Sequence, residues 1–262
     1  MKLAIHGAAG RMGQRVTALA SKDPRFQIVA ALESANHPAL GKDAGLLAGV
    51  GEIGVPLGVV GESGADVVID FSVPDAAVAV VAHCVEFSRP LVIATTGLEP
   101  EQQEYVRKSA KKIPIVWSPS MSTAVNVAMK LTEITAMALR DLPSGVDVEI
   151  IERHHRFKED APSGTALKFG QIVADVMDID EHTHGRSGRP GVRPRNEIGY
   201  HAVRAGDNPG EHTIIFGMLG ETLEIRVAAS NRDCYAQGAL LAAEWLIGKP
   251  PGLYGMKDVL GL

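Results

Sequence analysis

The segment Glu152–Ala166, which reads ERHHRFKEDAPSGTA, gathers residue types that can transfer protons. His154 and His155 are adjacent, and Lys158 follows a few positions later. A histidine can act as an acid near neutral pH, and a lysine can donate a hydrogen bond or a proton to a carbanion-like centre. Because histidine pairs are not rare, these residues alone leave two interpretations open: a catalytic segment, or a solvated polar loop before an ordinary helix.

The end of this segment has the residue types of a helix start. Ser163 is a favourable N-cap, and Pro162 precedes it. The N–H groups of Gly164 and Thr165 would then lack partners within the helix and could bind an anion, such as a carboxylate.

The histidines do not indicate a metal site. Adjacent side chains such as those of His154 and His155 tend to diverge, and no cysteine or carboxylate cluster has the spacing of metal ligands. His182 and His184 fall in a segment rich in His, Gly, Arg and Pro, Asp178–Arg195. We interpret that segment as a flexible loop and its two histidines as solvated. We therefore expect no metal.

A glycine-rich turn, GAAGRMG at Gly7–Gly13, separates an expected strand from an expected helix. Gly7 suits a tight turn, Gly10 allows close approach to a pyrophosphate, and Gly13 allows the helix to pack closely on the strand. Glu33 follows about 20 residues later, where a carboxylate accepts hydrogen bonds from the adenosine ribose. A glycine-rich turn can also bind nothing, but this strand, helix and acid together favour a dinucleotide.

Several ordered motifs along the whole chain resemble those of the 4-hydroxy-tetrahydrodipicolinate reductases. The string at His154–Ala166 is the most specific of them. The resemblance implies hydride transfer from NADH or NADPH to a cyclic imine dicarboxylate in lysine (diaminopimelate) biosynthesis. The other motifs are GAAGRMG, DFSVPDA at Asp70–Ala76, ATTGL at Ala94–Leu98, SPSMSTAVNV at Ser118–Val127, IGYHAVRAGD at Ile198–Asp207, GEHTIIF at Gly210–Phe216 and the final GLYGMKDVLGL.

The same resemblance implies a role for each matching residue. His154 and Lys158 would be the catalytic proton donors, His155 would contact substrate, and Gly164 and Thr165 would hold a substrate carboxylate. The cofactor-binding residues would be Gly7, Ala8, Ala9, Gly10, Arg11 and Met12 at the pyrophosphate, Glu33 at the ribose, Ala94, Thr95 and Thr96 beside the nicotinamide, and Ser118, Pro119, Ser120 and Met121 in a second loop.

Three positions depart from the family pattern. Ala94 replaces a usual glycine, Ser120-Met121 replaces a usual Asn-Phe pair, and Ser34 stands where a basic residue often follows the acid. A carboxylate at Glu33 disfavours the extra phosphate of NADPH, and Ser34 supplies no compensating charge. We therefore expect NADH to be used at least as well as NADPH, unless Arg11 or Lys42 reaches that phosphate.

The elements that must position these residues form an α/β pattern in the first half of the chain. Near-continuous apolar strands alternate with helices, which indicates a parallel sheet covered on both faces, as in a Rossmann-like dinucleotide-binding domain. The expected strands are Lys2–His6, Gln27–Glu33, Val67–Ser72, Leu91–Thr95 and Ile113–Trp117, and the expected helices are Arg11–Ser21, one beginning at Pro74, and Glu101–Lys111.

The second half indicates an α+β substrate and oligomerisation domain with a mixed sheet. Leu223, Ile225 and Val227 alternate with charged residues, so one face of that strand should be buried, and the family resemblance suggests burial in a homotetramer. We place this domain at residues 125–234, between the two parts of the dinucleotide domain, 1–124 and 235–262. Its expected elements are Thr123–Leu139, Asp147–Glu152, Gly164–Met177, Glu197–Val203, His212–Phe216 and Thr222–Ala228, before a last helix at Tyr235–Ile247.

Composition limits the classes of function. The 262 residues carry a net charge of −5, which argues against nucleic-acid and anionic-membrane partners, and no apolar run is long enough for a membrane span. Two cysteines, Cys84 and Cys234, do not suggest a secreted disulfide scaffold, so we expect a cytoplasmic protein. Two other functions stay open: a different two-domain nicotinamide oxidoreductase, and a regulator that binds a dinucleotide without turnover.

Overall fold

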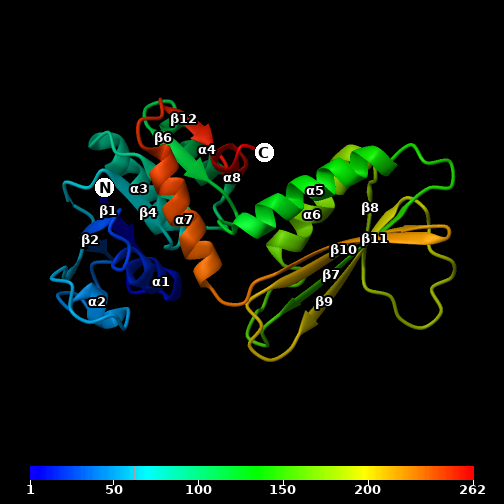
Figure 1. Cartoon of the computed structure of the whole chain (residues 1–262), viewed down its shortest axis with the longest axis horizontal. Coiled ribbons are helices and arrows are strands. Elements are labelled where there is room, and N and C mark those ends of the chain that lie inside the picture. Colours follow the sequence, from blue (N-terminus) through cyan, green and yellow to red (C-terminus); the bar gives the residue numbers. More distant parts are fainter. Residues whose placement is uncertain (62) are drawn as a thin grey trace. The chain divides into compact units, whose positions relative to one another are not determined.

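The computed structural model describes residues 1–61 and 63–262 and divides into two compact units (Figure 1). The first comprises Met1–Thr123 and Arg232–Leu262, and the second Ala124–Asn231. The elements of the first unit are β1 (Lys2–His6), α1 (Arg11–Ala20), β2 (Gln27–Leu32), α2 (Ala44–Leu47), β3 (Leu57–Gly58), β4 (Val67–Asp70), α3 (Pro74–Glu86), β5 (Leu91–Ile93), α4 (Pro100–Ser109), β6 (Pro114–Trp117), α7 (Asp233–Leu246), β12 (Gly252–Tyr254) and α8 (Met256–Leu260).

The first unit contains a seven-stranded parallel sheet with the strand order β12-β6-β5-β4-β1-β2-β3. Successive residues of each strand point to opposite faces, so both faces are apolar. On one face Leu3 and Ile5 pack with α1 and α7, whereas on the other Ala4 packs with α3 and α4. This confirms the predicted doubly covered α/β domain.

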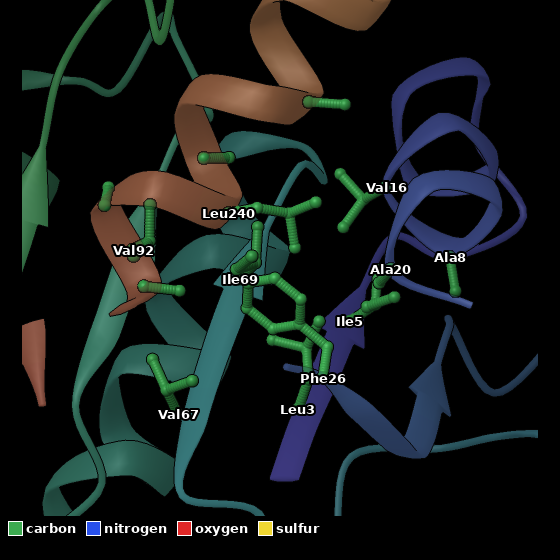
Figure 2. Packing of buried hydrophobic residues seen from close by; sticks show 14 of the residues in the cluster. Leu3, Ile5, Ala8, Val16, Ala20, Phe26, Val67, Ile69, Val92 and Leu240 are labelled. Atoms are coloured by element: carbon green, nitrogen blue, oxygen red, sulfur yellow. The ribbon is translucent and has the colours of Figure 1, made fainter. Parts of the chain in front are cut away.

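Helix α7 completes the core of the first unit, although it follows the second unit in the sequence. In Figure 2, Leu240 of α7 and Val16 of α1 point into the same apolar layer above β1 and β4. The main chain of α7 approaches closely at Gly238, where a Cβ would lie 1.7 Å from the carbonyl oxygen of Met121. The helix is therefore part of the first unit's packing.

The strand order reverses between β1 and β4. Strand β1 pairs with β2 on one side and with β4 on the other. The strands that follow β1 therefore extend the sheet toward one edge, and those that follow β4 extend it toward the other. The carboxyl ends of strands at such a reversal form the usual ligand crevice of open parallel sheets. The glycine turn follows β1 directly, and Phe71–Val73 follows β4.

The second unit contains a five-stranded mixed sheet with the order β11-β10-β7-β9-β8. The β11–β10 and β10–β7 pairs are antiparallel, and the β7–β9 and β9–β8 pairs are parallel. This confirms the predicted mixed sheet. Its elements are α5 (Thr123–Leu139), β7 (Asp147–His154), α6 (Gly164–Met177), β8 (Glu181–His184), β9 (Glu197–Arg204), β10 (Glu211–Met218) and β11 (Glu221–Ala228).

Both long helices of the second unit, α5 and α6, pack with one face of its sheet. Phe169 of α6 and Ile150 of β7 lie in this core, which also includes Val227 and, partly buried, Ile225. The oligomer stays a prediction. Within β11, Val227 is buried and Ile225 partly buried in this core, whereas Leu223 stays 43% exposed.

Strand β8 corrects the interpretation of residues 178–195 as a loop. His182 and His184 lie in this strand, which pairs in parallel with β9. Both imidazole rings stack on Tyr200, and the Nδ1 atom of His182 lies 2.9 Å from the Tyr200 hydroxyl. The exposed polar residues of β8 are therefore held by backbone pairing and by ring contacts, not merely solvated.

Candidate active site

The glycine turn after β1 has the close approaches that its sequence predicted. Gly7 has φ of +74°, and a Cβ there would lie 2.5 Å from the carbonyl oxygen of Phe71. A Cβ on Gly13 would lie 2.1 Å from the carbonyl oxygen of Gly7. Any larger residue would therefore separate β1, the turn and α1, which need to touch if a pyrophosphate is to approach the backbone.

The N-terminus of α1 is suited to bind an anion. Gly10 is the N-cap and offers no side chain to the free N–H groups, and the first turn contains no acidic residue. Nearby is an open pocket of about 450 Å³. The pocket brings together the ends of β1, β4 and β5 and is lined by Arg11, Met12, Phe71, Ser72, Val73, Pro74, Ala94, Thr95 and Thr96.

Glu33 lies directly after β2 and contacts the glycine turn. Its carboxylate accepts hydrogen bonds from the N–H of Ala9 at 3.2 Å and from the N–H of Ser34 at 3.0 Å. These bonds fix the side chain beside the turn, and a carboxylate has further lone pairs to offer. The predicted ribose-binding position is thus close to the predicted pyrophosphate-binding turn.

A buried polar chain at the ends of β1, β4 and β5 was not predicted from the sequence. The Nδ1 atom of His6 lies 2.7 Å from one carboxylate oxygen of Asp70, and the hydroxyl of Thr95 donates to the other at 2.6 Å. The Thr95 hydroxyl also accepts from the N–H of Ser72 at 3.0 Å. This chain of hydrogen bonds fixes one wall of the pocket. Asp70 stands in the motif DFSVPDA, but its partners come from strands that only the fold brings together.

The loop Ser118–Met121 follows β6 at the same edge of the sheet. The N–H of Ser118 donates to the carbonyl oxygen of Ile93 at 3.3 Å, and the Ser118 hydroxyl donates to the carbonyl oxygen of Ser120 at 2.8 Å. Pro119 is exposed, whereas Met121 is 1% exposed and packs in the apolar core. The side chain of Met121 therefore serves packing, and Pro119 is the exposed residue of the loop, since Ser118 and Ser120 are buried.

In the second unit, His154 is the last residue of β7 and lies against a buried carboxylate. Its Nδ1 atom lies 2.5 Å from Glu152, whose side chain is 1% exposed. Because an ionised carboxylate only accepts hydrogen bonds, Nδ1 donates to it and the Nε2 atom is left for other partners. Burial lowers the pKa of His154, and Glu152 opposes part of that effect.

Glu152 was not predicted from the sequence as a site residue, nor was Arg204. Arg204, at the end of β9, donates two hydrogen bonds to the Glu152 carboxylate, at 2.6 and 2.8 Å. Burial would raise the pKa of Glu152, but the bonds from Arg204, His154 and the backbone of Ser163 outweigh it and lower the pKa. Parallel pairing of β7 with β9 creates this arrangement, since it places His154 beside Arg204 in register.

Lys158 and His155 lie in the loop after β7. The Nζ atom of Lys158 lies 2.8 Å from Asp160 and is partly exposed, so it can exchange this partner for a ligand. The Nδ1 atom of His155 is buried, and the described residues offer it no hydrogen-bond partner. Both residues lie in the segment that joins β7 to α6.

Helix α6 begins where the sequence predicted. The side chain of Ser163 accepts from the N–H of Ala166 at 3.2 Å, and the N–H of Ser163 donates to Glu152 at 3.0 Å. Gly164 is exposed and a Cβ there would meet nothing within 4 Å, so a ligand can approach the backbone. The N–H groups of Gly164 and Thr165 thus lie at a helix N-terminus suited to a carboxylate.

His212 of β10 is a further neighbour that was not predicted. Its ring contacts that of His154 edge-on, with centroids 5.3 Å apart. Burial, assisted by the positive field of His154, lowers the pKa of His212 to about 4. His212 is therefore neutral at neutral pH and does not compete with His154 as a proton donor there.

Neither a metal centre nor a membrane span emerges from the described residues. Across residues 1–61 and 63–262, no group of three or more His, Cys, Asp or Glu side chains is placed to hold a metal ion. Within the same residues, no helix is both long and apolar enough to cross a membrane.

The fold and these sites define a class: a two-domain oxidoreductase with a Rossmann-like unit and a second unit in which a buried histidine–glutamate pair lies beside a helix N-terminus. Two family models cover nearly the whole chain. The model for the N-terminus of dihydrodipicolinate reductases matches residues 1–121, and the model for their C-terminus matches residues 124–260. The chain belongs to the dihydrodipicolinate reductase family.

Individual relatives agree with the family models. The chain is 56% identical to the 4-hydroxy-tetrahydrodipicolinate reductase of Rhodopirellula baltica, over 100% of this chain and 96% of the relative. It is 46% identical to that of Alkalilimnicola ehrlichii, over 100% and 99%. Among solved structures it resembles the dipicolinate-bound dihydrodipicolinate reductase of Paenisporosarcina sp. TG-14, with 25% identity, a TM-score of 0.77 and 98% of each chain covered.

A more distant structure shares the fold alone. The amine dehydrogenase of Mycobacterium smegmatis is 12% identical, with a TM-score of 0.65, over 97% of this chain and 94% of that one. Two-domain dehydrogenases of other specificity therefore have a similar fold, and function must be argued from the site and the family.

Proposed function

We propose how the residues of this chain carry out the family reaction, the reduction of 4-hydroxy-tetrahydrodipicolinate to tetrahydrodipicolinate in lysine biosynthesis. The turn Gly7–Met12 holds the cofactor pyrophosphate, Glu33 holds the adenosine ribose, and Ala94–Thr96 lines the nicotinamide pocket, with Ser118–Met121 as a second cofactor loop. The free N-terminus of α1 and the absence of side chains at Gly7 and Gly10 fit a dinucleotide phosphate. The nicotinamide, when bound, supplies the hydride.

The second unit binds the substrate and supplies protons. The substrate is a dicarboxylate, so Gly164 and Thr165 at the start of α6 bind one carboxylate through their N–H groups, and His155 adds a contact. As the hydride arrives, electron density moves onto the substrate ring. His154 through its Nε2 atom, or Lys158 through its Nζ atom, then supplies the proton.

The observation that carries this assignment is the oriented imidazole of His154, whose Nδ1 is held by a buried carboxylate. We expect His154→Gln and Lys158→Ala each to lower turnover by about 100- to 10,000-fold while leaving cofactor affinity nearly unchanged. The measurement is oxidation of NADH, with substrate generated in the cuvette by the preceding enzyme of the pathway, beside titration of NADH by fluorescence. Near-normal turnover in both variants would reject the roles of these residues.

The same assay separates the two alternatives raised by the sequence. A dinucleotide-binding regulator would bind NADH but show no turnover with this substrate. A dehydrogenase of other specificity would turn over another substrate and not this one. Turnover of the lysine precursor excludes both, and the family relationship is the reason to expect it.

For the cofactor, the family uses NADH or NADPH, and we propose that this chain uses NADH at least as well. Glu33 is fixed beside the glycine turn, and a carboxylate there repels the extra phosphate of NADPH. Ser34 supplies no cation. We expect Ser34→Arg to raise kcat/KM for NADPH relative to NADH, with Ser34→Ala as the matched control.

The wild-type ratio tests the same proposal. A preference for NADPH of tenfold or more, about 1.4 kcal/mol, would mean that another residue binds the phosphate. Arg11 and Lys42, both exposed, are the candidates in that case. Removing each in turn would then identify which one binds it.

We also propose that the chain works as a cytoplasmic homotetramer whose partner is its small dicarboxylate substrate, without nucleic-acid or membrane partners. The family resemblance supports the tetramer, and the net charge of −5 supports the absence of a polyanionic partner.

A further inference from the structure

The Glu152 carboxylate touches three separate elements of the second unit. It accepts from His154 at the end of β7, from Arg204 at the end of β9, and from the N–H of Ser163 at the start of α6. Its side chain is 1% exposed. A buried carboxylate costs free energy unless it is fully paired, so this position carries a specific set of donors.

We propose that Glu152 is a positioning residue that fixes the His154 imidazole and the anion-binding start of α6 relative to each other. The inference deepens the proposed function and rests on His154 as a proton donor. One oxygen of the carboxylate, Oε2, accepts from His154, and the other, Oε1, accepts from Ser163. The proton donor and the carboxylate-binding N–H groups are thus joined through a single side chain.

The first consequence concerns the tautomer of His154. Its Nδ1–H is committed to Glu152, so proton exchange with a ligand must occur at Nε2. Without the carboxylate, the ring could carry its neutral-state proton on either nitrogen and could rotate. Misplacing a catalytic group by about 1 Å can lower the rate by about 100-fold.

The second consequence concerns charge. The groups that face His154 are Glu152 on its own strand, Arg204 on β9, His212 on β10 and Lys158 in the following loop. His212 is neutral at neutral pH, and Lys158 and Arg204 both lower the pKa of His154. Glu152 is the anion that opposes them and stabilises the imidazolium.

Arg204 anchors the arrangement. Its two bonds to Glu152 hold both carboxylate oxygens, and its Nη2 atom also donates to the carbonyl oxygen of Asp160 at 2.7 Å. Asp160 in turn pairs with Lys158. Arg204 therefore connects the Glu152 carboxylate to the loop that carries the second proposed proton donor.

The test uses Glu152→Gln, which keeps the shape of the side chain and removes its charge. We expect kcat/KM to fall by about 100-fold, the substrate KM to rise, and the NADH dissociation constant to stay unchanged. We also expect one limb of the profile of kcat/KM against pH to report the protonation of His154, so that His154→Gln abolishes it. In Glu152→Gln this limb should move to lower pH by about 1 to 3 units, because the imidazolium loses its anionic partner.

The reciprocal variant, Arg204→Gln, removes a cation and leaves the carboxylate in place. The same limb should then move to higher pH, opposite to its movement in Glu152→Gln. A merely structural loss would not produce shifts of opposite sign. Arg204→Gln also keeps the proposal testable if Glu152→Gln folds poorly, since the proposal predicts the direction of the shift for each variant separately.

The matched control is Glu197→Gln. Glu197 is also buried and bonded to an arginine, Arg186, but it starts β9, at the opposite end of the sheet from Arg204. We expect it to lower stability without moving the pH limb. If Glu152→Gln leaves the limb and the substrate KM unchanged while His154→Gln abolishes the limb, Glu152 has no positioning role and the proposed function stands. If His154→Gln keeps both turnover and the limb, the role of His154 fails, and this inference with it.

Discussion

At the scale of single residues, prediction from sequence worked where a residue and its partners lie close together in the chain. Ser163 caps α6 through Ala166, three residues on, and the residue pattern predicted it. Glu152 and Arg204 were missed because 52 positions separate them and only parallel pairing of β7 with β9 makes them neighbours. The sequence signal that could have found Glu152 is its place in the strand alternation, because a charged residue there falls on the same face as the apolar Val148 and Ile150.

The role of Thr165 can be tested at this scale. We expect Thr165→Val to raise the substrate KM by about 10-fold or more and to change kcat little, since a carboxylate held in the ground state is held equally in the transition state. Thr165→Ser, which keeps the hydroxyl, is the control and should stay near wild type. Steady-state kinetics decide the matter: a large loss of kcat at unchanged KM would contradict a role in binding.

At the scale of elements, amphipathic helices and apolar strands were predicted well, and short or polar elements were not. The bounds of α5 and α6 agree with the sequence prediction. The two-residue strand β3 gives no readable period, and β8 is polar throughout, so neither has the alternation that marks a half-buried strand. Strand β8 forms because β9 offers it a paired edge and Tyr200 an aromatic surface.

The second sheet should also be sensitive to acid. The pKa of His212 falls from an ordinary value of 6.5 to about 4 because the ring is buried. The folded protein therefore binds this proton less readily than the unfolded chain. The stability from neutral His212 is fully present above pH 6.5 and is lost as pH falls towards 4, with about 2 kcal/mol lost between pH 7 and pH 5.

Urea unfolding at pH 7 and pH 5, at one protein concentration, measures this loss. The variant His212→Gln should lose less stability between these pH values than wild type does. His184→Gln, which changes an exposed histidine of the same sheet, should behave like wild type. An unchanged pH dependence in His212→Gln would assign the acid sensitivity to other groups.

The carboxylate Glu149 does not contribute to this loss between pH 7 and pH 5. Burial would raise its pKa, but hydrogen bonds from Arg186, Arg193 and His201 lower the pKa to about 2. The stability that ionised Glu149 contributes is therefore lost only below the ordinary pKa of 4.5.

At the scale of the whole molecule, the sequence predicted one chain that leaves its first domain and returns to it. The return is explained by packing, because α7 supplies Ala236, Ala239 and Ala243 to the core of the parallel sheet. Small side chains let this helix lie close to the strands. Strand β12 then extends the same sheet beside β6, which the sequence did not predict because only three residues pair.

The predicted tetramer comes from the family resemblance, and one face of the second sheet offers a surface for it. Helices α5 and α6 pack with one face of this sheet. The opposite face carries Ile151 and Val203 and is not covered by helices of the same unit, so it is available to a partner subunit. These two side chains are 39% and 42% exposed. Around them lie ion pairs such as Arg153–Glu211 at 2.6 Å, which give the face a polar rim.

We expect wild-type protein to scatter light as a tetramer at micromolar concentration. Ile151→Glu should reduce the assembly to a smaller species, because a charge buried between apolar faces lacks a partner. Leu46→Glu, at an exposed apolar residue of the first unit, is the matched control and should leave the mass unchanged. A wild-type monomer would reject the tetramer. A tetramer that persists unchanged in Ile151→Glu would place the interface on another surface, since the open face of the second sheet would then bear a charge without consequence for assembly.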